Sequence, residues 1–458
     1  MPNRVSWRRS IQAVAFLITL GVHPVLARGE DAETSAPPLG AADRVAAALE
    51  DPVLRELVRD SLERNPALAT SIAVARASLH QAPQAQALPD PVVGVTGYLS
   101  SPETRVGPQR LMATLSQRLP WKGKRRLRQE AAMRRSEALV SDVSARRLDL
   151  VTEVRRLSLE IAYLDAYRSV VETDRETLIH YEQLARARYA SGSGIEQGVI
   201  KIQAEITKDD NRLLEIATRR ATLVAELNAL RDRPQESPVP EIALPGRTRT
   251  APPVPIVRAR ALEARPELDA AGAELARADT MVEIARREYK PDVTLGATYG
   301  LVTARSDLAP GITVPNDGKD VFGLSVSVNL PIKRGRLDAG LEEATEQRLA
   351  AVEHRRDVSA SVDRAVGELV ERLRLSGEQV GLFERVLLIQ AEQSLRSAES
   401  GYAAGNLNSL DLLDAERVLL EVRTGIERAR ADHAIALARL EGAIGAPLED
   451  DNPEGASR

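Results

Sequence analysis

The sequence predicts a mainly helical chain with a small β part, in which long antiparallel coiled-coil hairpins accompany four membrane-spanning strands. Three observations predict this fold class. No proline interrupts the stretch between Pro120 and Pro234, four short segments alternate apolar with small polar residues, and the same landmarks occur twice along the chain. A long proline-free stretch with an apolar stripe is typical of a helix, and strict alternation is typical of a strand.

The first 27 residues are typical of a cleaved signal peptide. Three arginines between positions 4 and 9 precede an apolar stretch from Ile11 to Val22, and Val25-Leu26-Ala27 is a small-residue cleavage site. We therefore expect export, with cleavage after Ala27. An uncleaved membrane anchor and a twin-arginine signal are the alternatives.

Composition excludes several classes of function. The 458 residues carry 62 Lys plus Arg against 66 Asp plus Glu, a net charge of −4, and no cysteine. Near-balanced charge argues against a nucleic-acid binder. Without cysteine there is neither a thiolate metal site nor a lipid anchor on an N-terminal Cys. The five histidines are scattered, and no nucleophile, base and orienting group occur together. We expect no enzyme, no cofactor and no metal site.

Landmarks that recur at offsets of 200 to 213 residues indicate a tandem duplication. The pairs are Asn65-Pro66-Ala67-Leu68 with Arg265-Pro266-Glu267-Leu268, Pro89-Asp90-Pro91-Val92 with Lys290-Pro291-Asp292-Val293, Leu119-Pro120-Trp121-Lys122-Gly123-Lys124 with Leu330-Pro331-Ile332-Lys333-Arg334-Gly335-Arg336, and Arg188-Tyr189-Ala190-Ser191-Gly192 with Gly401-Tyr402-Ala403-Ala404-Gly405. The predicted segments are a signal peptide (1–27), an N-terminal linker (28–58), a first repeat (59–233), a proline-rich connector (234–258), a second repeat (259–446) and a tail (447–458).

Each repeat is expected to contain one very long helix and a returning partner. A heptad stripe marks the first long helix: it comprises Leu150, Val154, Leu157, Ile161, Leu164, Arg168, Val171, Arg175 and Leu178. A helix from Lys124 to Tyr189 is roughly 100 Å long at 1.5 Å per residue. Similar stripes resume after Gly192 and after Gly405. The first comprises Ile202, Ile206, Asp209, Leu213, Ile216, Arg220, Leu223 and Leu227, and the second comprises Leu412, Ala415, Leu419, Val422, Ile426, Ala429, His433, Ala436 and Leu440. The long helices are therefore predicted to turn back through glycine-containing loops.

Two pairs of strands are predicted before the long helices. They are Val93–Leu99 with Leu111–Arg118, and Val293–Leu301 with Phe322–Leu330. Each has about nine residues, the length that crosses a bilayer when tilted. A half-buried soluble sheet is the alternative for any single strand. Four strands with faces of Gly, Ser, Thr and Asn in an exported chain favour a membrane barrel.

The strand count predicts the assembly. An open sheet edge in hydrocarbon leaves backbone groups without hydrogen bonds, and the smallest usual barrels have about eight strands. Two copies would give eight strands around an interior filled by side chains, whereas three copies give twelve strands and an open lumen. We therefore expect a homotrimer with a 12-stranded β-barrel, whose helices form a periplasmic α-barrel.

Two motifs give the chain a resemblance to a known family. Tyr402-Ala403-Ala404-Gly405-Asn406-Leu407-Asn408-Ser409-Leu410-Asp411-Leu412-Leu413-Asp414-Ala415 and Leu119-Pro120-Trp121-Lys122-Gly123-Lys124-Arg125 resemble signatures of the TolC family of outer membrane factors. The second motif is similar to the version in the heavy-metal CzcC-like branch. The resemblance covers about residues 60 to 446. It implies an outer membrane exit duct that receives heavy-metal cations or drugs from an inner-membrane pump of the RND type, through a periplasmic adaptor.

The resemblance also implies a constriction at the periplasmic end, with Asp411 and Asp414 at the matching positions. Because the pair is spaced i and i+3 on a helix, both carboxylates can face one way, and threefold symmetry gives a ring of six charges. The alternative is that Asp411 only favours the start of its helix. The chain departs from the family at the ionic latch, in which an acidic residue near the first turn pairs with a basic residue in the second and closes the tip. The matching positions here are Gly198 and Leu407, so another closure would have to replace the latch.

Two surfaces are expected to meet partners. The turns around Tyr189, Gly192, Tyr402 and Gly405 are predicted to contact the adaptor; a plain helical hairpin with glycine at positive φ is the alternative. The second surface is expected to meet outer membrane lipid. Its membrane-interface aromatics are Trp121, Tyr98, Tyr299 and Phe322, and the basic run that starts at Lys122 is expected near lipid headgroups.

The rival functions are a type I protein secretion duct and a periplasmic coiled-coil scaffold or adaptor without a channel.

Overall fold

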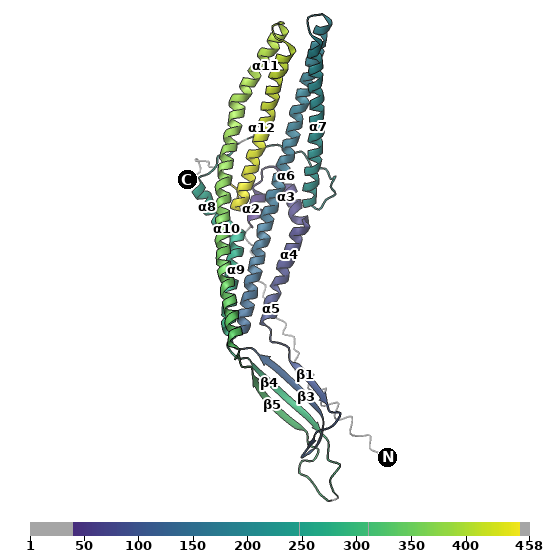
Figure 1. Ribbon diagram of the computed structural model, residues 1–458, viewed down its shortest axis with the longest axis vertical. Helices are drawn as coiled ribbons and strands as arrows, with labels where there is room; N and C mark the ends of the chain where they lie inside the picture. The colour runs from purple at the N-terminus through teal and green to yellow at the C-terminus, as the bar shows by residue number, and fades with distance from the viewer. Residues whose placement is uncertain (1–39, 247, 310, 449–458) are drawn as a thin grey trace, which may run out of the picture. The chain divides into compact units, whose positions relative to one another are not determined.

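The computed structural model describes residues 40–246, 248–309 and 311–448. The predicted signal peptide lies outside the described residues. Helices dominate and one small sheet is present (Figure 1), so the predicted fold class is confirmed. The first half contains α2 (Ala41–Ala47), α3 (Pro52–Arg64), α4 (Pro66–Leu79), α5 (Gln81–Gln86), β1 (Val92–Gly97), β2 (Glu103–Thr104), β3 (Gly107–Leu119), α6 (Lys124–Ala190) and α7 (Glu196–Leu230). The second contains α8 (Val254–Ala264), α9 (Pro266–Arg287), β4 (Val293–Val302), β5 (Val321–Val328), α10 (Arg334–Leu382), the π-helical turn η1 (Phe383–Leu387), α11 (Leu388–Ala403) and α12 (Ser409–Ile444).

The long helix α6 has 67 residues, which makes it about 100 Å long. Its ends agree with the predicted helix 124–189 to within one residue. Its counterpart in the second half is divided, because the π-helical turn η1 joins α10 to α11. There the ring of Phe383 lies so close to Gly425 of α12 that a Cβ atom on the glycine would come within 2.4 Å of a ring carbon. This tertiary contact has no counterpart in the heptad pattern.

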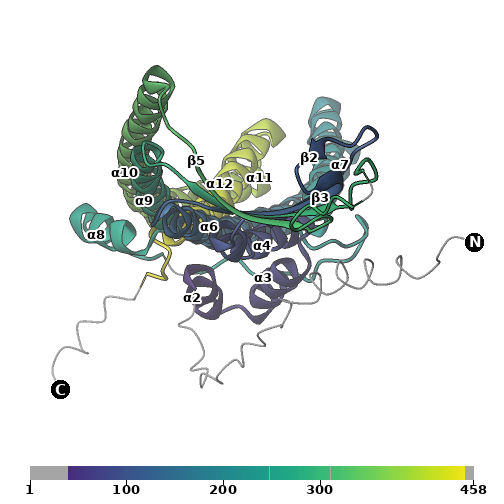
Figure 2. The same ribbon diagram turned by 90° about the horizontal axis from the view of Figure 1, so that it is seen from below.

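The helices pack around α6. It contacts α7 and α9, α9 in turn contacts α10, and α12 contacts both α6 and α10 (Figure 2). The short helices α2 and α3 also pack on α6. The helix α3 begins at Pro52, because Asp51 accepts hydrogen bonds from the Val53 and Leu54 N–H groups. Helical structure thus starts inside the segment 28–58 that the sequence predicted as a linker.

The sheet joins strands from both halves. Its four long strands are antiparallel in the order β1-β3-β4-β5, and the two-residue β2 pairs with β3. The central pairing of β3 with β4 aligns Leu119 with Val293 and Ala113 with Tyr299. The four predicted strands are present, and β2 was not predicted. The outer strands β1 and β5 each pair on one side within the chain.

Between α7 and α8, the described residues of the proline-rich connector, which exclude position 247, form neither helix nor strand. Val239 and Ile242 are buried in the core that α2, α3, α6 and α7 form. Further along, the Arg249 N–H donates to Nε2 of His433 at 2.9 Å. Burial lowers the pKa of His433, so the neutral ring is the acceptor. The helix α8 begins at Val254, before the predicted end of the connector at residue 258.

Candidate functional site at the helix tips

Two helical turns end the hairpins on the side away from the sheet (Figure 1). The helix α6 ends at Ala190 and α7 starts at Glu196, while α11 ends at Ala403 and α12 starts at Ser409. Each turn reverses at a glycine with positive φ, which is +76° at Gly192 and +81° at Gly405. A side chain at either position would strain the backbone. Both predicted turn glycines are therefore where the chain reverses.

The two turns contact each other. The Arg188 guanidinium donates to the Tyr402 carbonyl oxygen and lies 4.6 Å from the centroid of the Tyr402 ring. At the start of α7, a Cβ atom on Gly198 would lie 2.2 Å from Oγ of Ser409, so only glycine permits this approach to α12. The contact between Arg188 and Tyr402 thus joins the two hairpins at their tips.

The predicted adaptor-contact residues differ in exposure. Tyr189 is 47% exposed, whereas the side chain of Tyr402 is 6% exposed and belongs to the tip core. Gly192 and Gly405 are exposed. Leu407, which with Gly198 corresponds to the expected latch positions, packs its side chain against Gly401. The solvent-facing surface of the second turn therefore comes from its glycine and the residues around it, and not from the tyrosine ring.

Asp411 and Asp414 lie in the first two turns of α12, and both are exposed. The Asn408 side chain accepts hydrogen bonds from the Leu410 and Asp411 N–H groups at 2.7 and 3.2 Å. The Asp411 carboxylate accepts from the Asn408 N–H at 3.1 Å, which completes a capping box. Asp411 therefore stabilises the start of its helix, as the alternative interpretation required. Asp414 makes no contribution to this cap, so its exposed carboxylate is not explained by helix capping.

The predicted interface aromatics lie near both ends of the sheet. Trp121 follows β3 at the end next to α6 and is 40% exposed. Tyr299 pairs with Phe322 toward the opposite end of β4 and β5, and Tyr98 follows the end of β1 there, with its N–H bonded to the Arg110 carbonyl. Phe322 is 69% exposed. The structure thus separates Trp121 from the other three by most of the length of the strands.

A buried ion pair at the junction of sheet and helices was not predicted. Lys124 and Asp292 are 1% and 5% exposed, and Nζ of Lys124 donates to Oδ1 of Asp292 at 3.0 Å. The lysine also donates to the Lys290 carbonyl at 3.0 Å, and Arg118 donates to Oδ2 of Asp292 at 2.7 Å. Burial raises the pKa of Asp292, but hydrogen bonds from the Trp121 N–H, Lys124 and Arg118 outweigh it and hold the pKa at about 2. Lys124 and Asp292 both belong to landmarks that recur in the two halves of the sequence. This recurrence was the sequence signal that could have pointed to them.

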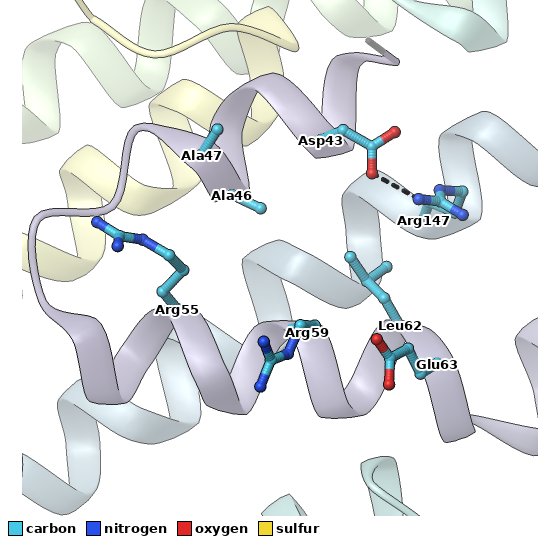
Figure 3. Close-up of a pocket in the computed structure, with 8 residues that line it drawn as sticks. All are labelled: Asp43, Ala46, Ala47, Arg55, Arg59, Leu62, Glu63 and Arg147. Carbon is cyan, nitrogen blue, oxygen red and sulfur yellow. Dashed lines mark hydrogen bonds and ion pairs between the residues drawn. The ribbon is translucent and has the colours of Figure 1, made fainter. Parts of the chain in front are cut away.

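The cavity that Figure 3 shows lies elsewhere on the chain. It has a volume of about 300 Å³ between α2, α3 and α6, and its lining includes Asp43, Arg55 and Arg147. The three charged residues named here make bonds within the protein: Arg147 donates to Asp43 at 2.6 Å, and Arg55 donates to the Leu49 carbonyl at 2.5 Å. Arg147 is about 60 Å along α6 from Arg188. The cavity is therefore separate from the tips.

Within the part of the chain that the structure describes, no helix is long and apolar enough to cross a membrane. In the same residues, no group of three or more His, Cys, Asp and Glu side chains has the arrangement of a metal site.

Comparisons with known proteins identify the family. The family model of the outer membrane efflux protein matches residues 57–231 and 257–446. The chain is 26% identical over 313 residues to the cobalt-zinc-cadmium resistance protein CzcC of Cupriavidus metallidurans, which covers 66% of this chain and 69% of that protein. Its structure resembles the outer-membrane channel OprN with a TM-score of 0.75 at 18% identity, over 92% of this chain and 98% of that one. It resembles the open state of the Neisseria gonorrhoeae MtrE outer membrane channel with a TM-score of 0.71 at 22% identity, over 93% and 97% of the two chains.

These structural similarities show the fold, and the family model matches in two blocks that lie in the two halves of the chain. The predicted resemblance to TolC-family outer membrane factors is confirmed. The chain belongs to the outer membrane efflux protein family.

Proposed function

We propose that three copies of the chain form an exit duct in the outer membrane of a Gram-negative bacterium. The duct would receive substrate from an RND pump of the inner membrane through a periplasmic adaptor. The observation that carries the proposal is the sheet, in which β1 and β5 each pair with a single neighbouring strand among the residues that the structure describes. Joining β1 of one copy to β5 of the next satisfies both edges, and three copies complete a barrel of twelve long strands.

The side chains of β5 support a lipid-facing wall. Phe322, Leu324 and Val326 are 69%, 79% and 69% exposed, and they alternate with Gly323 and Ser325. An apolar face toward lipid and a face of small polar residues toward the lumen are typical of a membrane barrel with a wet interior. In this arrangement, Trp121 and the three aromatics at the other end of the sheet would lie at the two membrane interfaces.

The tips supply the proposed gate and docking surface. Threefold symmetry would gather Asp411 and Asp414 of three copies into a ring of six carboxylates around the axis, which attracts cations. The exposed turns around Gly192 and Gly405 would contact the adaptor. Heavy-metal cations are the proposed cargo, with drugs as the alternative, because a negative ring suits cations and a relative of the chain is named for cobalt, zinc and cadmium resistance.

One experiment tests the duct itself. The purified full-length protein in detergent should crosslink as a trimer, and after insertion into planar bilayers it should conduct ions in discrete steps. A periplasmic scaffold or adaptor would give a soluble monomer or dimer without conductance, and that result would reject the proposal. Deletion of the gene, followed by growth tests with metal salts, drugs and detergents, then identifies the cargo.

The Arg188 contact is proposed to hold the tip closed. Arg188→Ala should raise the open-to-closed ratio of each protomer about fivefold, because it removes a cation–π contact worth about 1 kcal/mol. The measurement is the open probability in planar bilayers. Arg186→Ala is the matched control, since Arg186 is exposed and pairs with Glu182 on its own helix. Equal open probabilities in the two variants would show that the Arg188 contact does not restrain opening.

A further inference from the structure

Three acidic side chains from three helices meet inside the helical bundle near the tips. Asp174 of α6, Asp209 of α7 and Glu416 of α12 are 5%, 0% and 3% exposed. The Asp174 carboxyl group neighbours both others, and the three helices that carry them contact one another. One helical turn closer to the tips, Leu178 of α6 and Leu412 of α12 belong to the apolar tip core. The three side chains therefore form one buried carboxyl cluster where α12 packs against the α6–α7 hairpin.

The cluster has too few cations for three ionised carboxylates. Arg212 donates to Oδ1 of Asp209 at 2.6 Å. One oxygen of each carboxyl group is buried without a hydrogen-bond donor, and these atoms are Oδ1 of Asp174, Oδ2 of Asp209 and Oε2 of Glu416. The other charged or titratable groups around the cluster are Tyr181 of α6, Glu205 and Lys208 of α7, Glu399 of α11, and Arg417 and Arg423 of α12.

Most of these surrounding groups are already bonded elsewhere. Lys208 and Arg417 both pair with Glu205, and Tyr181 donates to Glu399 at 2.7 Å. Only Arg423 remains to favour an ionised Glu416 through space. Full ionisation would thus leave adjacent negative charges in a buried site, which costs far more free energy than binding a proton.

A proton fits the geometry better than a metal ion does. A neutral Asp174 carboxyl group donates one hydrogen bond to a neighbouring carboxylate, and the described residues contain no group of three or more acidic or imidazole side chains arranged as a metal site. Burial first, and then the hydrogen bonds with Glu416 and Asp209, raise the pKa of Asp174 to about 9. Burial also raises the pKa of Glu416.

We propose that Asp174, Asp209 and Glu416 form a proton-binding site that holds a proton at neutral pH and thereby fastens α12 to the α6–α7 hairpin. When the proton leaves, neighbouring carboxylates repel one another across the helix interface. Any movement that separates α12 from α6 exposes the cluster to water, lowers its proton affinity and releases the proton. The link from this movement to opening of a duct rests on the proposed function, whereas the proton-binding site itself does not.

The test compares Asp174→Asn with Asp210→Asn in the full-length protein. Asp210 is the exposed neighbour of Asp209 and pairs with Arg175 at the surface, so its variant is the matched control. Infrared spectra should show a protonated carboxyl band at pH 7 in the wild type and in Asp210→Asn. The band should disappear as the pH rises past about 9, and Asp174→Asn should lack it, because an amide occupies the site without a titrating proton.

Thermal unfolding gives a second readout. Because the pKa of Asp174 in the folded chain is raised above its ordinary value near 4, its contribution is fully present below pH 4 and is lost as the pH rises toward 9. The wild-type Tm should therefore fall by about 5 °C between pH 5 and pH 9. The Tm of Asp174→Asn should fall by at most half as much over the same pH range, since its amide donates hydrogen bonds at every pH. Asp210→Asn should keep all of it.

Several results would overturn the proposal. They are a wild-type spectrum without a protonated carboxyl band at pH 7, an unchanged band in Asp174→Asn, and a Tm increase on adding Zn²⁺ or Ca²⁺ that Asp174→Asn abolishes, which would assign a metal site instead. If Asp174→Asn does not fold, Glu416→Gln takes its place with the same expected changes. None of these readouts requires conductance, so failure of the duct proposal is detected separately.

Discussion

Replacing Lys124 by Met is expected to destabilise the chain by about 3 kcal/mol, the largest effect that we predict for a single substitution. The lysine is buried where β3 leads into α6, and its partner Asp292 lies where α9 leads into β4. Removing the ammonium group leaves the Asp292 carboxylate buried with Arg118 as its remaining charged partner. The expected loss is at the lower end of the range for broken buried pairs, because that arginine stays.

Thermal unfolding in detergent and the amount of protein in the outer membrane measure this effect. Lys122→Met is the control, because Lys122 is exposed and only two residues away. Adding Asp292→Asn to Lys124→Met should restore part of the lost stability, since the amide is neutral and its oxygen still accepts from the Trp121 N–H. Similar melting temperatures for Lys124→Met and Lys122→Met would mean that the pair does not hold the junction.

The same pair predicts acid sensitivity. The pKa of Asp292 in the folded chain is about 2, below its ordinary value of 3.8. Its contribution to stability is therefore fully present above about pH 4 and is lost as the pH falls toward 2. In the double variant this component of acid unfolding should disappear.

Local patterns predicted the long elements well, because each pattern extends over many residues. The limits of α6 follow from the proline-free stretch and the heptad stripe. The predicted stripe on α12 is buried at every position, from Leu412 through Ala429 and His433 to Leu440. Such repetition averages out local exceptions.

The pattern was wrong where charged residues interrupt the stripe of α6. Counting by heptads assigned Arg168 and Arg175 to the buried line, but the side chain of Arg168 is 59% exposed and pairs with Glu172. The buried residue is Asp174. A straight helix drifts from a strict heptad by about 20° per repeat, and hydrophobicity gives no reason to bury a carboxyl group. Of the three cluster residues, Asp209 stands on the predicted stripe that resumes after Gly192. Asp174 and Glu416 stand on none of the predicted stripes.

Contacts between distant segments were also beyond the sequence. Lys124 and Asp292 are 168 positions apart, and nothing local in either landmark states that one side chain meets the other. The π-helical turn starts at Phe383, whose ring packs against Gly425 of another helix. The site at the tips was predictable to the extent that the family motif carries it. The side chain of Tyr402, predicted to contact the adaptor, is buried in the tip core. Arg188 from the other hairpin lies over its ring, a contact that the motif does not state.

The double substitution Asp411→Asn and Asp414→Asn is expected to lower the cation-to-anion permeability ratio of the duct about tenfold, which corresponds to about 1.4 kcal/mol of electrostatic free energy. In a trimer it removes six charges from the proposed aperture. The reversal potential under a KCl gradient in planar bilayers measures the ratio. Asp210→Asn is the control, because Asp210 is exposed on α7 and lies outside the proposed ring.

Asparagine is the informative replacement because it separates charge from capping. An asparagine at position 411 keeps a side-chain oxygen that can accept from the Asn408 N–H, so the capping box survives without the charge. If Asp411 acts only through the helix dipole, the double variant should lose about 0.3 to 1 kcal/mol of stability and keep its ion selectivity. If the two aspartates form the ring, selectivity changes most, and Asp414→Asn alone produces part of the change although Asp414 takes no part in the cap. Unchanged selectivity in both variants would place the constriction elsewhere.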